Sequence, residues 1–145
     1  MMKIKLDVDK LLDDFFEDAC LLGIVAPVKD YQFAWHINQT LGFNFILNHS
    51  IEIPLKKKGR DYYFSIYEYL VPGTSLAHYL YNNEDDGEYL LPEFKHLDFL
   101  WLTKGEMLSK TELQTLIQSL RLLPSVQLVT EMTNEKIKNK QHLIF

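Results

Sequence analysis

The stretch IEIPLKKKGRDYYFSIYEYL, residues 51–70, decides the fold class of this chain. Apolar and polar side chains alternate over residues 51–55, and an aromatic run of strand type fills residues 61–70. This period of two predicts two β-strands, and the basic cluster Lys56 to Arg60 between them predicts a hairpin connection. Pro54 has no backbone N–H to donate, so the first of these strands is expected at an edge. The middle of the chain therefore predicts an antiparallel sheet.

On the amino-terminal side the pattern predicts a strand, a helix and another strand. Residues 3–8 alternate like a short strand, residues 9–18 carry apolar side chains at helical spacing, and residues 19–25 form a short apolar run typical of a buried strand. Asp30 is placed to cap a further helix over residues 31–41, and Gly42 is placed to end that helix in the left-handed conformation.

On the carboxy-terminal side the chain predicts one more strand–helix–strand series. The segment 75–81 alternates as a strand, and the acidic, glycine-containing segment 82–88 predicts a mobile loop. An apolar strand follows over about residues 97–103 and ends at Gly105. Ser109 and Glu112 form a capping box that starts a helix with apolar side chains at positions 113, 116, 117 and 120. Pro124 stops this helix, and residues 126–132 alternate as a final strand.

This order predicts an α+β fold: residues 1–145 form a single domain with a mainly antiparallel sheet and two principal helices packed on one face. A ferredoxin-like or related sandwich is the expected arrangement. A chain of 145 residues can bury a core of its own without disulfides or metals.

Composition excludes several classes of function. The net charge of −5 argues against a dedicated nucleic-acid-binding protein, which needs Lys and Arg to neutralise phosphates. The single cysteine, Cys20, excludes an internal disulfide and every multi-cysteine zinc pattern. No signal-peptide or membrane-spanning run is present, which predicts a cytoplasmic location without membrane association. We find no glycine-rich phosphate loop, dinucleotide fingerprint or nucleophile elbow, and expect no cofactor.

The segment LPEFKHLDF, Leu91 to Phe99, carries charges next to an apolar run. Pro92 suits the first position of a single helical turn, PEFK, and Glu93 would lie at its positive end. Asp98, if it lies on the strand, needs partners such as the backbone amides of the preceding turn, Lys95 or Arg60, because an unpaired buried carboxylate is costly. The structural interpretation is that Glu93 and Asp98 hold this turn in place. The functional alternative is that Glu93, His96 and Asp98 converge as a catalytic or ligand-binding site.

LPEFKHLDF also resembles the motif that names the IPExxxVDY family, a set of small bacterial proteins. Pro92, Glu93 and Asp98 match that motif, while Leu91, Leu97 and Phe99 replace Ile, Val and Tyr. The segment LLGIVAPVKDYQFAWHIN, with Lys29, Asp30, Tyr31, Trp35 and Asn38, and the ending IKNKQHLIF add to the resemblance. The resemblance implies no activity, because the family has none assigned.

Seven of the eight tyrosines lie between Tyr62 and Tyr89, on both faces of the predicted strands. An uncovered tyrosine face would form an interface, most simply with a second copy of the chain. The alternative is that the terminal segments cover this face. We expect a non-enzymatic protein-interaction module that forms a homodimer, with a small-molecule-binding or catalytic domain as the alternative. The five histidines show no metal-ligand spacing, and His78 is placed to face the core. The candidate interface residues are Tyr63, Tyr67, Tyr69, Tyr79 and Tyr81.

Overall fold

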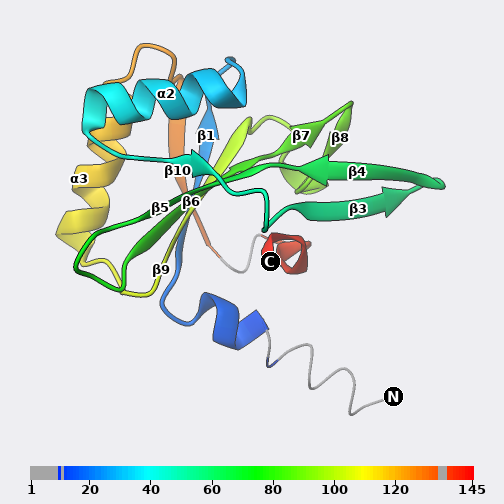
Figure 1. Cartoon of the computed structure of the whole chain (residues 1–145), viewed down its shortest axis with the longest axis horizontal. Coiled ribbons are helices and arrows are strands. Elements are labelled where there is room, and N and C mark those ends of the chain that lie inside the picture. The colour runs from blue at the N-terminus through cyan, green and yellow to red at the C-terminus, as the bar shows by residue number, and fades with distance from the viewer. Residues whose placement is uncertain (1–9, 11, 134–136) are drawn as a thin grey trace.

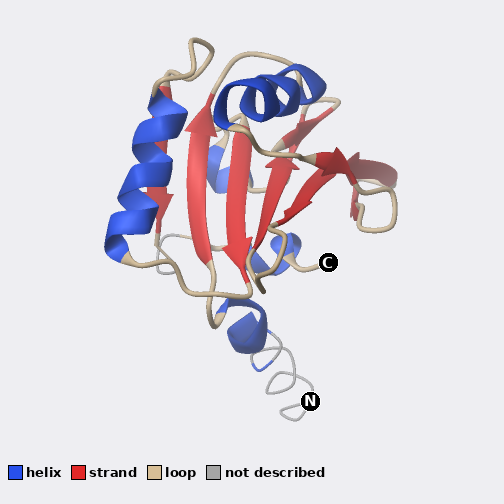
Figure 2. Ribbon diagram, turned by 60° about the vertical axis from the view of Figure 1, so that its left-hand side comes forward, coloured by secondary structure: helices blue, strands red, loops and turns tan. Residues whose placement is uncertain are grey.

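The computed structural model describes residues 10, 12–133 and 137–145, and its centre is a six-stranded antiparallel sheet. The strand order across this sheet is β10-β1-β9-β6-β5-β2, and two separate two-stranded sheets pair β3 with β4 and β7 with β8. The prediction of an α+β fold with a mainly antiparallel sheet is confirmed (Figure 2). The elements are β1 (Cys20–Val25), α2 (Asp30–Leu41), β2 (Ile46–Leu47), β3 (Ile53–Lys57), β4 (Arg60–Phe64), β5 (Ile66–Leu70), β6 (Ala77–Asn82), β7 (Glu84–Asp85), β8 (Glu88–Tyr89), η1 (Pro92–Phe94), β9 (Phe99–Lys104), α3 (Lys110–Arg121), β10 (Leu128–Met132) and η3 (Lys140–Leu143).

Four strands and two helices give the ferredoxin-like connectivity. The helix α2 follows β1, and α3 connects β9 to β10, so that β1, α2, β6, β9, α3 and β10 form a βαββαβ series. Numbered along the chain, these four strands lie in the sheet in the order fourth, first, third, second. Strands β5 and β2 extend the sheet beyond β6, and the hairpin β3–β4 projects from it as an arm (Figure 1).

The helices α2 and α3 both cover one face of the sheet, as the sequence predicts (Figure 1). Their apolar stripes meet the side chains of β1, β9, β6 and β10 in one cluster. The fully buried Trp101 is the largest member of this cluster. The helices contribute Phe33, Ala34, Ile37, Leu113, Leu116, Ile117 and Leu120, and the strands contribute Leu22, Ile24, Leu80, Phe99, Trp101 and Val129.

The opposite face of the sheet is covered by the arm and by both terminal segments. A helical turn at residues 12–16 places Phe15 and Phe16 against this second cluster, and η3 buries Leu143 in it. Figure 1 shows these segments on the side away from α2 and α3. Both faces of the sheet are thus buried within one chain. The central strands accordingly carry runs of apolar residues rather than a strict alternation.

The predicted helix boundaries are confirmed, with one correction. Gly42 ends α2 with φ of 74°, and the Ser109 hydroxyl accepts a hydrogen bond from the Glu112 N–H at 3.1 Å. The N-cap of α2 is Lys29, however, and not Asp30. Asp30 is the first helical residue, and its carboxylate accepts a hydrogen bond from the Tyr67 hydroxyl at 3.1 Å. The Asp30 side chain therefore contacts β5 instead of capping its own helix.

Three strand predictions need comment. The aromatic run 61–70 is divided at Ser65 into β4, which belongs to the arm, and β5, which belongs to the main sheet. The acidic segment that we predicted as a loop contains the hairpin β7–β8, which turns at Asp86 and Gly87 with φ of 49° and 86°. The predicted strand at residues 3–8 lies outside the described residues. Among the described residues, no helix has the length and apolar character needed to span a membrane.

Candidate functional site

Asp98 holds the end of β1 to the start of β9. Its Oδ2 accepts a hydrogen bond from the Ala26 N–H at 2.8 Å, and its own N–H donates to the Ile24 carbonyl at 2.8 Å. The residue lies just before β9, which begins at Phe99, rather than on the strand as expected. The partner is an amide that follows β1, and not the preceding turn, Lys95 or Arg60. Asp98 therefore satisfies a backbone donor where β1 leaves the sheet.

Glu93 connects the turn η1 to the carboxy-terminal segment. Its Oε2 accepts from the N–H groups of Lys138 and Asn139 at 2.7 and 2.8 Å, and its Oε1 accepts from the Asn139 side chain at 2.8 Å. Burial acts to raise the pKa of Glu93, but these hydrogen bonds outweigh it and lower the pKa overall. Glu93 thus remains ionised and anchors the segment that leads to η3.

Asn83 is the organising residue of this region, and the sequence analysis missed it. Its fully buried side chain donates to the carbonyls of Phe94 and Leu97 at 3.1 and 2.8 Å and accepts from the Leu91 N–H at 2.9 Å. The backbone carbonyl of Leu97 would otherwise be buried without a donor. The available signal was a pair of asparagines, Asn82 and Asn83, between an apolar strand and an acidic stretch.

The structure does not bring Glu93, His96 and Asp98 together as one site. Glu93 faces the carboxy-terminal segment, Asp98 faces Ala26, and the side chain of His96 is exposed. Among the described residues, no group of three or more His, Cys, Asp and Glu side chains is arranged to hold a metal ion.

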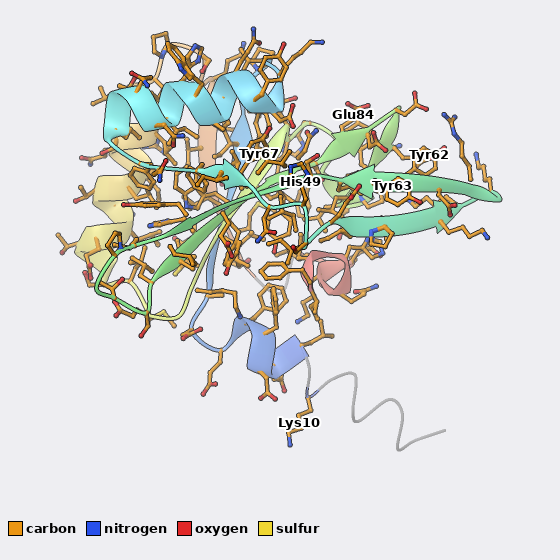
Figure 3. All side chains as sticks on the ribbon, viewed as in Figure 1. Lys10, His49, Tyr62, Tyr63, Tyr67 and Glu84 are labelled. Carbon is orange, nitrogen blue, oxygen red and sulfur yellow. The ribbon has the colours of Figure 1, made fainter. Side chains whose placement is uncertain are left out.

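The five candidate interface tyrosines are divided between the interior and the surface. Tyr67, Tyr79 and Tyr81 are 7%, 9% and 0% exposed, whereas Tyr63 is 52% exposed and Tyr69 is partly buried. The Tyr81 hydroxyl donates to the Leu143 carbonyl at 2.7 Å, so η3 covers it. Figure 3 shows Tyr63 on the arm and Tyr67 beside α2. Tyr79 and Tyr81 therefore lie under the carboxy-terminal segment, as the alternative expected, whereas Tyr67 belongs to the cluster on the helical side of the sheet. An interface through these tyrosines stays a prediction.

Burial also determines the chemistry of these phenols. Burial and, to a lesser extent, the Glu68 carboxylate raise the pKa of Tyr79 to about 12. Burial raises the pKa of Tyr81 well above its ordinary value, and burial together with Asp30 raises that of Tyr67. All three side chains are neutral hydrogen-bonding groups at physiological pH. They contribute to the core rather than to acid–base chemistry.

The outer face of α2 is the surface whose composition the fold does not explain. Tyr31 and Trp35, one helical turn apart, are 58% and 60% exposed. They line a hollow of about 410 Å³ together with Gln32 and His36. The other exposed residues of α2, Gln39 and Thr40, are also uncharged. We call Tyr31, Gln32, Trp35, His36 and Gln39 the α2 face.

The helix α3 provides the contrast, because Lys110, Glu112 and Arg121 give its exposed side the charges usual for a surface helix. The α2 face lacks such charges and presents two large aromatic side chains instead. The sequence signal was a helix with one acidic residue, Asp30, and aromatic residues at positions that its apolar stripe does not use.

The basic arm has its own partners within the chain. The hairpin turn at Lys58 and Gly59 forms as predicted, with φ of 53° and 76°. Lys57 pairs with Glu88 at 3.2 Å, and Arg60 pairs with Asp86. The acidic hairpin β7–β8 thus offsets part of the positive charge of the arm. This pairing reduces the charge available for phosphate binding.

Comparison with known proteins adds no family. No protein-family model matches the chain, and a search of curated proteins gave no significant match. The resemblance to the IPExxxVDY family therefore stays a prediction.

Proposed function

We propose that this chain is a non-enzymatic, cytoplasmic interaction module that forms a homodimer through the α2 face. The observation that carries this proposal is the exposure of Tyr31 and Trp35 on a helix whose exposed side has no charged residue. The centres of protein interfaces are enriched in tyrosine and tryptophan and depleted in charge. The two aromatic side chains frame a hollow into which a partner side chain could insert.

A second copy of the chain can bind at this face in spite of its net charge. The chain carries a net charge of −5, so two copies repel each other over most approaches. The α2 face is a surface where they can meet without placing like charges together. In a two-fold dimer, each copy presents the same patch, and the Trp35 side chain of one copy would fill the hollow beside Tyr31 of the other.

The size of the face sets the expected strength of the dimer. A helix of 12 residues is about 18 Å long, so its outer face is smaller than the roughly 800 Å² that each partner buries in a standard interface. We therefore expect a reversible dimer with a dissociation constant in the micromolar range, about 1–100 μM.

The test is the molar mass in solution, measured by light scattering on a size-exclusion column over a range of protein concentrations. Trp35→Glu places two like charges at the proposed two-fold contact and should weaken the dimer at least about 30-fold, the effect of losing roughly 2 kcal/mol at a hot spot. Tyr63→Glu is the matched control, because Tyr63 is also an exposed aromatic residue and lies on the arm.

A dimer lost in Trp35→Glu and kept in Tyr63→Glu supports the α2 face. The reverse pattern would move the interface to the arm, and a wild-type chain that stays monomeric up to millimolar concentration would exclude the homodimer. The alternative function, a ligand or catalytic site of Glu93, His96 and Asp98, has weaker support because both carboxylates are already bonded to backbone amides.

A further inference from the structure

A second feature of the helical side of the molecule is a pocket between the two helices. It has a volume of about 390 Å³ and lies between the end of α2, the sheet and one side of α3. Its apolar lining comes from Leu41, Phe43, Leu108 and Leu116, and His78 of β6 also lines it. We call it the His78 pocket. Volumes of this size and apolar linings with a few polar groups are typical of small-molecule sites.

His78 is oriented by a single, unambiguous hydrogen bond. The indole N–H of Trp101 lies 3.0 Å from Nδ1 of His78. An indole nitrogen only donates, so Nδ1 must be the acceptor, and the proton of the neutral ring is on Nε2. Among the described residues, Nε2 has no hydrogen-bond partner, and this atom is not fully buried although the residue as a whole is only 5% exposed. The pocket therefore contains one hydrogen-bond donor that the chain itself leaves unused.

The imidazole ring is held rigidly by aromatic neighbours. Tyr69 stacks on it with an interplanar angle of 12° at 5.9 Å between centroids, and Phe43 and Trp101 meet it edge-on at 5.1 and 5.5 Å. These contacts come from β5, from the segment after α2 and from β9. The direction of the free N–H is consequently fixed before any ligand binds, which lowers the entropic cost of binding.

The α3 wall of the pocket gives it a polar side. Thr111, Thr115 and Ser119 line it at intervals of four residues, so their hydroxyl groups form one row along the helix. The charged residue in the lining is Glu112, which already accepts from the Ser109 N–H in the capping box. An anion would be repelled by Glu112, and for a cation this exposed carboxylate, which already accepts from the Ser109 N–H, is a weak partner. The pocket suits an uncharged molecule.

We propose that the His78 pocket binds an uncharged, largely apolar small molecule whose carbonyl oxygen accepts a hydrogen bond from Nε2 of His78. The apolar part of the ligand packs on Leu41, Phe43 and Leu116, and its polar edge follows the hydroxyl row of α3. This site is independent of the α2 face and uses none of its residues.

The protonation state of His78 supports the same chemistry. Burial lowers the pKa of His78 to about 4, so the ring is neutral at physiological pH. The groups that face it are Tyr69 on β5, Trp101 on β9 and Phe43 after α2, and Glu112 lines the pocket from α3. Binding should therefore be constant between about pH 8 and pH 5.5, whereas a histidine of ordinary pKa would gain charge in that range.

The test uses 6-propionyl-2-dimethylaminonaphthalene, an uncharged fluorescent naphthalene with a ketone carbonyl, as the probe. We expect saturable binding of one probe per chain with a blue shift of its emission. Thr115→Trp, on the exposed side of α3, fills the pocket and should weaken binding at least about tenfold. Gln118→Trp is the matched control, because Gln118 is exposed on the same helix and does not line the pocket.

His78→Phe tests the hydrogen bond itself. It should weaken binding of the ketone about five- to tenfold, the loss of one hydrogen bond, and leave binding of 2-ethylnaphthalene unchanged. If His78→Phe does not fold, the imidazole ¹⁵N spectrum of the wild-type protein replaces it: the Nε2 resonance of His78 should shift on addition of the ketone and not of the hydrocarbon. No saturable binding to the wild type, equal binding to Thr115→Trp, or an unmoved Nε2 resonance in the saturated complex would each overturn the proposal.

Discussion

His78 should make the wild-type chain less stable at pH 5 than at pH 7, and a variant without the imidazole should lack this part of the pH dependence. Burial lowers the pKa of His78 from 6.5 to about 4 in the folded chain, while the unfolded chain keeps the ordinary value of 6.5. Below pH 6.5 the unfolded state therefore binds more protons than the folded state. The free energy of unfolding must then fall as the pH decreases, and His78 imposes no penalty well above pH 6.5.

The size of this effect follows from the two pKa values. Their difference corresponds to roughly 3 kcal/mol in total, of which about 2 kcal/mol is lost between pH 7 and pH 5. Carboxylates with lowered pKa, such as Glu93, start from an ordinary value of 4.5 and lose their contribution mostly below this window. Such a loss is a large fraction of the stability of a domain of this size.

The assay is urea unfolding at pH 7, 6 and 5, with the free energy of unfolding obtained by linear extrapolation. His78→Gln should be less stable than the wild type at pH 7, because it disturbs the contact with Trp101, but it should lose about 2 kcal/mol less than the wild type on going to pH 5. His49→Gln is the control, since His49 is exposed, and it should follow the wild type. If wild type and His78→Gln lose the same free energy between pH 7 and pH 5, the imidazole is not held neutral by burial, and the reasoning is wrong.

Three substitutions test the contacts around the sheet. Asp98→Ala leaves a backbone amide without its acceptor and should lower the free energy of unfolding by about 1–3 kcal/mol in a urea titration, whereas Asp98→Asn keeps an acceptor and should cost less. Gly105→Ala should lower the free energy of unfolding by more than about 3 kcal/mol or prevent folding, because an added Cβ would lie 1.8 Å from a backbone oxygen. Gly73→Ala, at a similar positive φ but with open space around it, should lower it by only about 1 kcal/mol. Equal melting temperatures of the two variants would contradict this reasoning. Glu93→Gln should lower the free energy of unfolding at pH 7 by about 0.5–1 kcal/mol, which a lower melting temperature would show. The difference from wild type should shrink as the pH falls below 4.5, because the lowered pKa of Glu93 stabilises the fold only while the carboxylate is ionised.

The sequence predicts the elements that depend on local signals. The Ser109 and Glu112 capping box, the apolar stripe of α3 and Gly42 at the end of α2 each act within a few residues, and all three are confirmed. The hairpin β7–β8 also has a local signal, because Asp86-Gly87 is a typical two-residue turn of a hairpin. We gave the negative charge of that segment more weight than its turn residues, and the turn residues decided the structure.

The errors in the sequence analysis concern contacts between distant segments. The break at Ser65 depends on β4 pairing with β3 while β5 pairs with β6, and no residue of the run 61–70 signals this change of partner. Asp30 was predicted to cap α2, but its carboxylate accepts a hydrogen bond from the hydroxyl of Tyr67, 37 residues further along the chain. Asn83 binds groups eight to fourteen residues further along the chain. Such partners are determined by the packed sheet, which a single sequence does not display.

Two departures from the usual pattern of polarity in this sequence have different outcomes in the structure. Glu93 and Asp98 are charges beside an apolar run, and the chain supplies their partners itself, from the amides of residues 138 and 139 and of Ala26. Tyr31 and Trp35 are exposed aromatic residues on the surface of α2. Burying them would remove apolar surface from water and would be favourable by about 25 cal/mol per Å² buried. No described segment of the chain performs that burial: the terminal segments lie on the opposite face of the sheet. The departure that the fold leaves uncompensated is therefore the one on which the proposed homodimer rests.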